Sequence, residues 1–130
     1  MEKIRETNLQ KKLLPSVNSV GFLIQHIGDV ELLFAKNVFS AADVKVSAKT
    51  VIDKYDTGEW TNFEELKNYV KYSFETLMGI VEKQTDEDWE SEISTKEFGT
   101  KTKAQAFGRI VSHTAYHAGQ LAIINKYGIN

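Results

Sequence analysis

The sequence predicts an all-α protein, a helical bundle that forms a single domain over residues 1–130. Apolar residues recur every three or four positions in three long segments, as they do along one face of an amphipathic helix. The chain has one proline, and no linker rich in glycine, serine or proline divides it. At 130 residues it is long enough to bury a core without disulfide or metal staples.

The first half of the chain predicts one short and one long helix. A short opening helix is expected over residues 3–14, where the apolar stripe is thin. The first long helix is expected from Val17 to Phe39, just after Pro15, with Ser16 or Asn18 as its N-terminal cap. Its apolar stripe consists of Val17, Val20, Ile24, Ile27, Val30, Phe34 and Val38.

Two further long helices are expected in the second half. The segment 61–64, Thr-Asn-Phe-Glu, has the pattern of a capping box, and the helix that follows should run to about Lys83. Thr102 and Gln105 form the same pattern at the start of the last helix, which should end at Gly128.

The connections over residues 40–60 and 85–101 are longer than a minimal bundle needs. Loops of this length often carry function or short structure of their own. Trp60 and Trp89, one in each connection, are expected to anchor them on the bundle.

Composition excludes several classes of function. Sixteen basic and eighteen acidic residues give a formal net charge of −2 and are spread along the chain, so neither nucleic acid nor an anionic membrane is an expected partner. The absence of cysteine excludes disulfides, thiolate nucleophiles and zinc sites of the cysteine type. The N-terminal residues are too charged for a signal peptide, and no run approaches the roughly 18 apolar residues of a membrane span. The expected location is cytoplasmic.

The three histidines are the candidate metal ligands. His113 and His117 are four residues apart in the last helix, a rise of about 6 Å that places both side chains on one face. His26 lies at the edge of the buried stripe of the first long helix, so all three can point into one groove between two helices. Such a site suits nickel or zinc, with iron or manganese as alternatives, and leaves positions open for water or substrate.

Other interpretations of these residues stay open. A histidine beside an apolar stripe is more often a hydrogen-bonded core residue than a ligand. A zincin site would need a glutamate where Thr114 stands, and a ferritin-like di-iron site would need Glu-x-x-His, which none of the three histidines has.

Asp29 and Gln120 are candidate second-shell residues. Asp29 could orient an imidazole N–H, and Gln120 could hydrogen-bond a metal-bound water or substrate. The alternatives are an exposed aspartate and a glutamine that packs or caps. Tyr116 is expected to serve packing or an interface, and Gly119 to allow close approach of another helix.

Two segments resemble the DinB-like superfamily, which includes the YfiT-type metal-dependent hydrolases and the bacillithiol and mycothiol S-transferases. NSVGFLIQHIGDVE (18–31) is similar to the family's Ser-x6-His segment, and HTAYHAGQL (113–121) to its His-x3-His-x-Gly-Gln signature. The resemblance runs from about residue 15 to the end. It implies a four-helix bundle in which His26, His113 and His117 hold a divalent ion.

The resemblance also implies a metal-dependent enzyme acting on a small molecule, by transfer of a low-molecular-weight thiol or by hydrolysis. The metal would be the Lewis acid, and Gln120 at most a positioning group. The rival is a non-catalytic metal-binding or stress-related interaction bundle, favoured by the absence of an obvious second general base.

One departure from the family concerns the first helix, which normally has about twenty or more residues. Only about fourteen precede Pro15 here, so the helix is expected to be short or truncated. An uncovered apolar stripe is an association surface, so a homodimer is expected.

Overall fold

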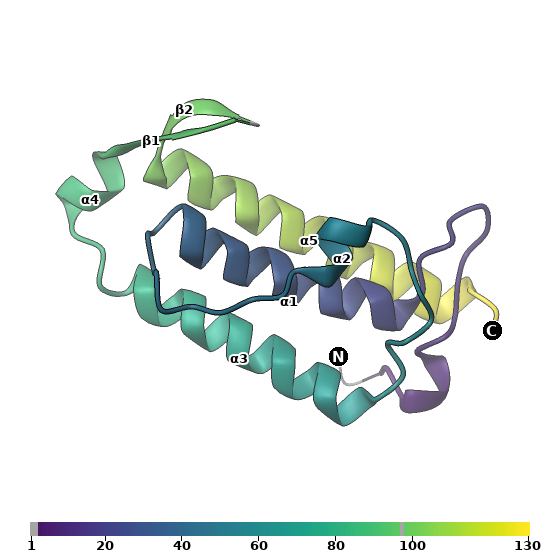
Figure 1. The fold of residues 1–130 in the computed structure, drawn as a ribbon. Helices are drawn as coiled ribbons and strands as arrows, with labels where there is room; N and C mark the ends of the chain where they lie inside the picture. The colour runs from purple at the N-terminus through teal and green to yellow at the C-terminus, as the bar shows by residue number, and fades with distance from the viewer. Residues whose placement is uncertain (1–2, 97) are drawn as a thin grey trace.

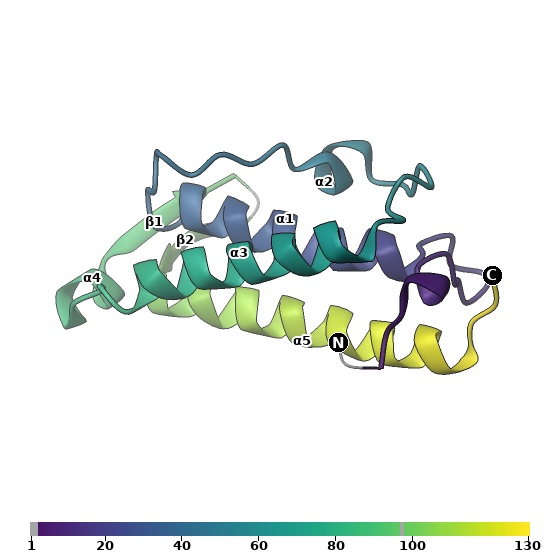
Figure 2. The same ribbon diagram turned by 90° about the horizontal axis from the view of Figure 1, so that it is seen from below.

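The computed structural model describes residues 3–96 and 98–130. Three long helices lie alongside one another, and α1 packs against both of the others (Figures 1 and 2). They are α1 (Val20–Asn37), α3 (Phe63–Val81) and α5 (Lys103–Tyr127). The shorter elements are η1 (Glu6–Asn8), α2 (Lys49–Asp53), α4 (Asp86–Glu90), β1 (Glu92–Thr95) and β2 (Gly99–Thr102).

The predominantly helical fold is confirmed, but the opening helix expected over residues 3–14 is not formed. Within the described part of this segment only η1, one 3-10 turn, is helical. Its backbone pairs with distant segments instead: Leu9 O accepts from Gly21 N at 2.9 Å, and Lys12 exchanges two hydrogen bonds with Ile129. The side chains of Ile4 and Leu9 are buried in the core, whereas that of Leu14 is exposed. These apolar residues therefore attach the segment to the core at two points and do not form a continuous helical face. The described residues therefore form three long helices rather than the expected four-helix bundle.

A small antiparallel sheet is the second difference from the expected all-α fold. β1 and β2 pair with Glu92 opposite Thr102 and Ser94 opposite Thr100. Gly99 has a φ of 69°, a left-handed conformation that glycine adopts without a steric penalty, where the hairpin turns into β2. The connection over residues 85–101 thus carries α4 and this hairpin.

The observed helix caps differ from the expected ones at two of three helices. Ser19 caps α1, its hydroxyl accepting from Phe22 N at 3.2 Å, where Ser16 or Asn18 was expected. Asn62 rather than Thr61 caps α3, in keeping with the stronger capping preference of asparagine. The capping box of Thr102 and Gln105 at α5 is confirmed.

The core surrounds α1 as two clusters, one near each end of the helix. Trp60 packs against the first cluster and Trp89 against the second, which confirms their expected role as anchors of the long connections. The Trp89 ring lies 5.8 Å from Phe39 and 5.5 Å from Phe107, measured between ring centroids. No described helix is both long enough and apolar enough to cross a membrane.

Two glycines of α1 let neighbouring segments come close to its backbone. A Cβ on Gly21 would lie 2.0 Å from the carbonyl oxygen of Trp60, and one on Gly28 would lie 2.6 Å from Cε1 of Tyr69. Gly119 does not have the close-packing role expected of it, because no described atom lies within 4 Å of the corresponding Cβ position.

We expect Gly21→Ala to lower the free energy of unfolding by about 1–3 kcal/mol, because the backbone of Trp60 would have to move. Gly108→Ala is the matched control, since a Cβ there meets nothing within 4 Å. That variant should gain about 0.5–1 kcal/mol from the better helix propensity of alanine. Urea denaturation of both variants measures the difference, and equal stabilities would contradict the close contact.

Candidate metal centre

The three histidines come together between α1 and α5. His26 is on α1, and His113 and His117 are one helical turn apart on α5. Their ring centroids are separated by 5.2 Å (His26 to His113), 4.9 Å (His26 to His117) and 4.4 Å (His113 to His117). One ligand nitrogen from each ring lies within 4.8 Å of the other two, and all three side chains are half-buried.

This arrangement fits a divalent transition-metal ion. The Nε2 atoms of His113 and His117 are 3.1 Å apart. Two nitrogens bound tetrahedrally to zinc at about 2.0–2.1 Å would be about 3.3–3.4 Å apart, so only a small adjustment is needed. Three nitrogen donors do not complete the coordination of such an ion, and one or more positions would remain for an exogenous ligand.

The ring of His26 is oriented by Thr50, which lies in α2. The Thr50 hydroxyl donates to Asp29 Oδ2 at 2.6 Å, since a carboxylate can only accept. Its one proton is thereby used, so Thr50 Oγ1 accepts from Nδ1–H of His26 at 3.2 Å. The Nε2 atom of His26 then carries the lone pair needed to bind a metal.

Asp29 is fully buried, unlike the exposed helix aspartate that was the alternative interpretation. Its carboxylate accepts four hydrogen bonds, two from the backbone N–H and hydroxyl of Thr50, one from Gln25 Nε2 at 3.1 Å and one from the Tyr69 hydroxyl. Burial, followed by the hydrogen bond to Asp29, raises the pKa of Tyr69, so the phenol keeps the proton that it donates. Asp29 therefore acts on His26 through Thr50.

Gln120 orients the ring of His117, which lies on the same helix. Nδ1–H of His117 donates to Oε1 of Gln120 at 2.6 Å, and Nε2 of Gln120 donates to the hydroxyl of Tyr116 at 3.3 Å. The glutamine thus contacts the outer nitrogen of the ring, where the sequence suggested a contact with metal-bound water or substrate. Tyr116, expected to serve only packing or an interface, belongs to this chain of contacts.

The electrostatic surroundings keep two of the imidazoles neutral at pH 7. Burial, followed by the nearby His117, lowers the pKa of His26. Burial, with smaller contributions from His117, His26 and Arg109, lowers the pKa of His113 to about 4. The neutral imidazole is the form that binds a metal.

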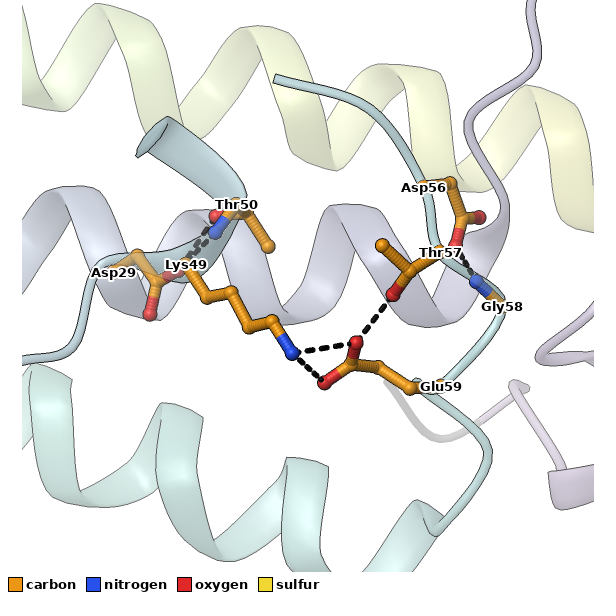
Figure 3. A network of polar contacts seen from close by, with 7 residues as sticks. All are labelled: Asp29, Lys49, Thr50, Asp56, Thr57, Gly58 and Glu59. Atoms are coloured by element: carbon orange, nitrogen blue, oxygen red, sulfur yellow. Dashed lines mark hydrogen bonds and ion pairs between the residues drawn. The ribbon is translucent and has the colours of Figure 1, made fainter. Parts of the chain in front are cut away.

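Residues 40–60, which we call the strap, run along the bundle beside α1 and carry α2 (Figures 1 and 2). Within the strap, an ion pair of 2.8 Å joins Lys49, the first residue of α2, to Glu59 (Figure 3). Asp56 ties the strap to α1 by accepting from Ser19 N at 3.0 Å, and also accepts from Gly58 N at 2.7 Å. These contacts fix the position of Thr50, and with it the ring of His26.

A cavity of about 230 Å³ lies between the strap and α1 and is lined by two of the three histidines, His26 and His117. It is lined by Asn18, Phe22, Leu23, His26, Thr50, Val51, Lys54 and His117. A second cavity of about 270 Å³ lies near Trp60 and Tyr69 and is not lined by any of the three histidines. Of these two cavities, the first therefore borders the candidate metal centre.

Sequence reasoning did not identify Thr50 and Tyr69 as residues that support the site, or Lys54 as a residue that lines its cavity. Thr50 and Lys54 lie in the strap, whose sequence has no helical periodicity, and only the unusual length of that connection indicated a role. Tyr69 lies in α3 and reaches Asp29 across 40 positions of sequence, a contact that no local pattern reveals.

Comparisons with known proteins identify relatives of this chain. A family model described as the DinB superfamily matches residues 1–121. Among solved structures, a DinB-like protein of Bacillus subtilis, YjoA, is similar with a TM-score of 0.69 and 22% sequence identity, over 96% of this chain and 78% of that chain. No curated protein matches the sequence.

We expect Thr50→Val to lower the free energy of unfolding by about 1–3 kcal/mol, because the buried carboxylate of Asp29 loses a donor and Nδ1 of His26 loses its acceptor. Thr50→Ser retains the hydroxyl and should restore most of the loss. Nitrogen NMR of the imidazoles gives a second measurement: His26 should be protonated at Nδ1 in the wild type and show a mixture of tautomers in Thr50→Val. Unchanged stability and tautomer would contradict the role of Thr50.

Stability of the metal-free protein should fall as the pH decreases from about 6.5 to about 4. The unfolded chain binds a proton at His113 with a pKa near 6.5, whereas the folded chain does so only near 4, so acid favours unfolding in this window. In His113→Gln the decline over the same window should be smaller. Urea denaturation at several pH values, with chelator present, measures both slopes, and equal slopes would contradict the lowered pKa.

Proposed function

We propose that this chain, which belongs to the DinB superfamily, is a metal-dependent enzyme that acts on a small molecule by thiol transfer or hydrolysis. His26, His113 and His117 hold a divalent ion in this proposal, nickel or zinc first and iron or manganese as alternatives. The observation that carries it is the convergence of three ligand nitrogens within 4.8 Å beside a cavity open to small molecules.

The ion would supply Lewis acidity and favour the thiolate form of a bound thiol or the hydroxide form of bound water. Thr50 and Gln120 hold the Nδ1 protons of His26 and His117, and so keep the Nε2 atoms available as ligands. Phe22, Leu23 and Val51 give the cavity an apolar wall that restricts water around a bound molecule.

A non-catalytic metal-binding or interaction protein is the second candidate. It is favoured by one observation: among the described residues that line the cavity, none is a carboxylate that could serve as general base. Metal-dependent consumption of a thiol such as bacillithiol, mixed with an activated electrophile, distinguishes the candidates. A panel of thiols and electrophiles without turnover would favour the second.

The metal site itself is tested by metal analysis of purified protein after incubation with nickel or zinc and removal of free ion. We expect about one equivalent in the wild type and a loss of at least tenfold in affinity in His117→Ala, because one of three ligands is removed. Ser112→Ala, an exposed position on the same helix, is the matched control and should behave as the wild type. Equal, near-zero uptake by the wild type and His117→Ala would refute the site.

Uptake should also depend on pH in the way that imidazole ligands require. It should weaken as the pH falls toward about 4, the pKa of His113 in the folded protein, because protons compete for the ligand nitrogens. Uptake that stays constant down to pH 4 would argue against histidine ligands.

A further inference from the structure

The cavity beside the histidines has an unbalanced charge. Imidazole ligands carry no negative charge, so they would leave the charge of a divalent ion uncompensated, and the described lining residues include no carboxylate. Asp29 lies nearby in the structure but is buried, with its oxygens engaged by Thr50, Gln25 and Tyr69. The one lining residue with a formal charge at neutral pH is a cation, Lys54. The cavity is therefore suited to an anion.

Contacts within the strap and with α1 hold the backbone around Lys54 in place. It follows α2 directly and has a φ of 62°, a left-handed conformation that residues other than glycine rarely adopt. The ion pair of Lys49 with Glu59 and the hydrogen bonds of Thr50 to Asp29 hold the segment on both sides of it (Figure 3). Unfavourable backbone conformations of this kind persist where the surrounding structure holds them, often at ligand-binding sites.

Lys54 is also available to a ligand. Lys49, five residues earlier, pairs with Glu59, whereas Lys54 makes no ion pair within residues 3–96 and 98–130. Asn18 lines the same cavity and adds a side-chain amide that can donate hydrogen bonds to an oxygen.

We propose that the small molecule bound at this site carries a carboxylate, and that Lys54 binds it while the reacting group of the same molecule faces the three histidines. The single charge of Lys54 matches a monoanion such as a carboxylate. Phe22 and Val51, which line the cavity together with Lys54 and His26, would contact the carbon chain between the two groups. This inference rests on the proposed metal site and adds the recognition of a carboxylate to it.

The test uses nickel-loaded protein and three thiols of increasing length: mercaptoacetate, 3-mercaptopropionate and 4-mercaptobutyrate, each compared with its methyl ester. Thiolate binding to nickel is followed by the charge-transfer absorption, which gives a dissociation constant without any measurement of activity. Acid and ester also differ in thiol acidity, so the quantity compared between proteins is the ratio of their affinities.

For at least one chain length we expect Lys54→Gln to lower the acid-to-ester ratio about tenfold relative to the wild type, through loss of a charge-assisted hydrogen bond, while affinity for the ester stays the same. Lys54→Gly should give the same loss and cannot fail through backbone strain, because glycine tolerates the left-handed conformation. Lys45→Gln, an exposed lysine of the same strap outside the cavity, should leave the ratio unchanged.

The acid-to-ester affinity ratio of the wild type should fall with added salt, because Lys54 is exposed and salt screens its charge. An unchanged ratio in both Lys54 variants at all three chain lengths, with nickel bound, would overturn the carboxylate proposal and leave the metal site standing. Absence of bound nickel in the same samples would overturn both.

Discussion

The buried carboxylate of Asp29 joins three parts of the fold that are distant in sequence. It is carried by α1, it accepts from Thr50 in the strap, and it accepts from Tyr69 on α3. A fully buried charge is tolerated only when hydrogen bonds replace its hydration, and here four donors do so. The absence of a side chain at Gly28 lets the Tyr69 ring approach α1 closely enough to reach the carboxylate. The position of the strap, the spacing of α1 and α3 and the orientation of His26 all depend on this group.

The three candidate metal ligands are positioned in two different ways. His113 and His117 are placed by one continuous helix, so their spacing follows from helical geometry alone. His26 is placed by α1 and oriented by a loop residue, Thr50. The two core clusters are built from apolar side chains, and none of the three histidines belongs to either. We therefore expect folding to depend on this core and not on an ion, in contrast to domains that need an ion to fold.

The sequence predicted the long helices and the shared face of His113 and His117 because both follow from local spacing, and it placed His26 beside them from its position at the edge of an apolar stripe. Periods of three and four residues identify a helical face, and the capping box at Thr102 marks a helix start within a few residues of chain. Residues 3–14 were misjudged, and the burial of Asp29 was not predicted, because long-range contacts decide both. Leu9 bonds to Gly21 and Lys12 to Ile129 in place of an opening helix, and Asp29 is buried by partners 21 and 40 positions away. No pattern within one segment contains that information.

The hydrogen bond from His26 to Thr50 has a thermodynamic consequence for the strap. Occupation of Nε2 by an ion would favour the tautomer that donates from Nδ1, and so would favour the hydrogen bond from His26 to Thr50. Binding of the ion and binding of any ligand that stabilises the strap would then be coupled. Each would raise the affinity for the other by the same factor. Local opening of the segment from Lys49 to Glu59 is then linked to occupancy of the site. Amide hydrogen exchange in this segment would report on the ion from residues that do not coordinate it.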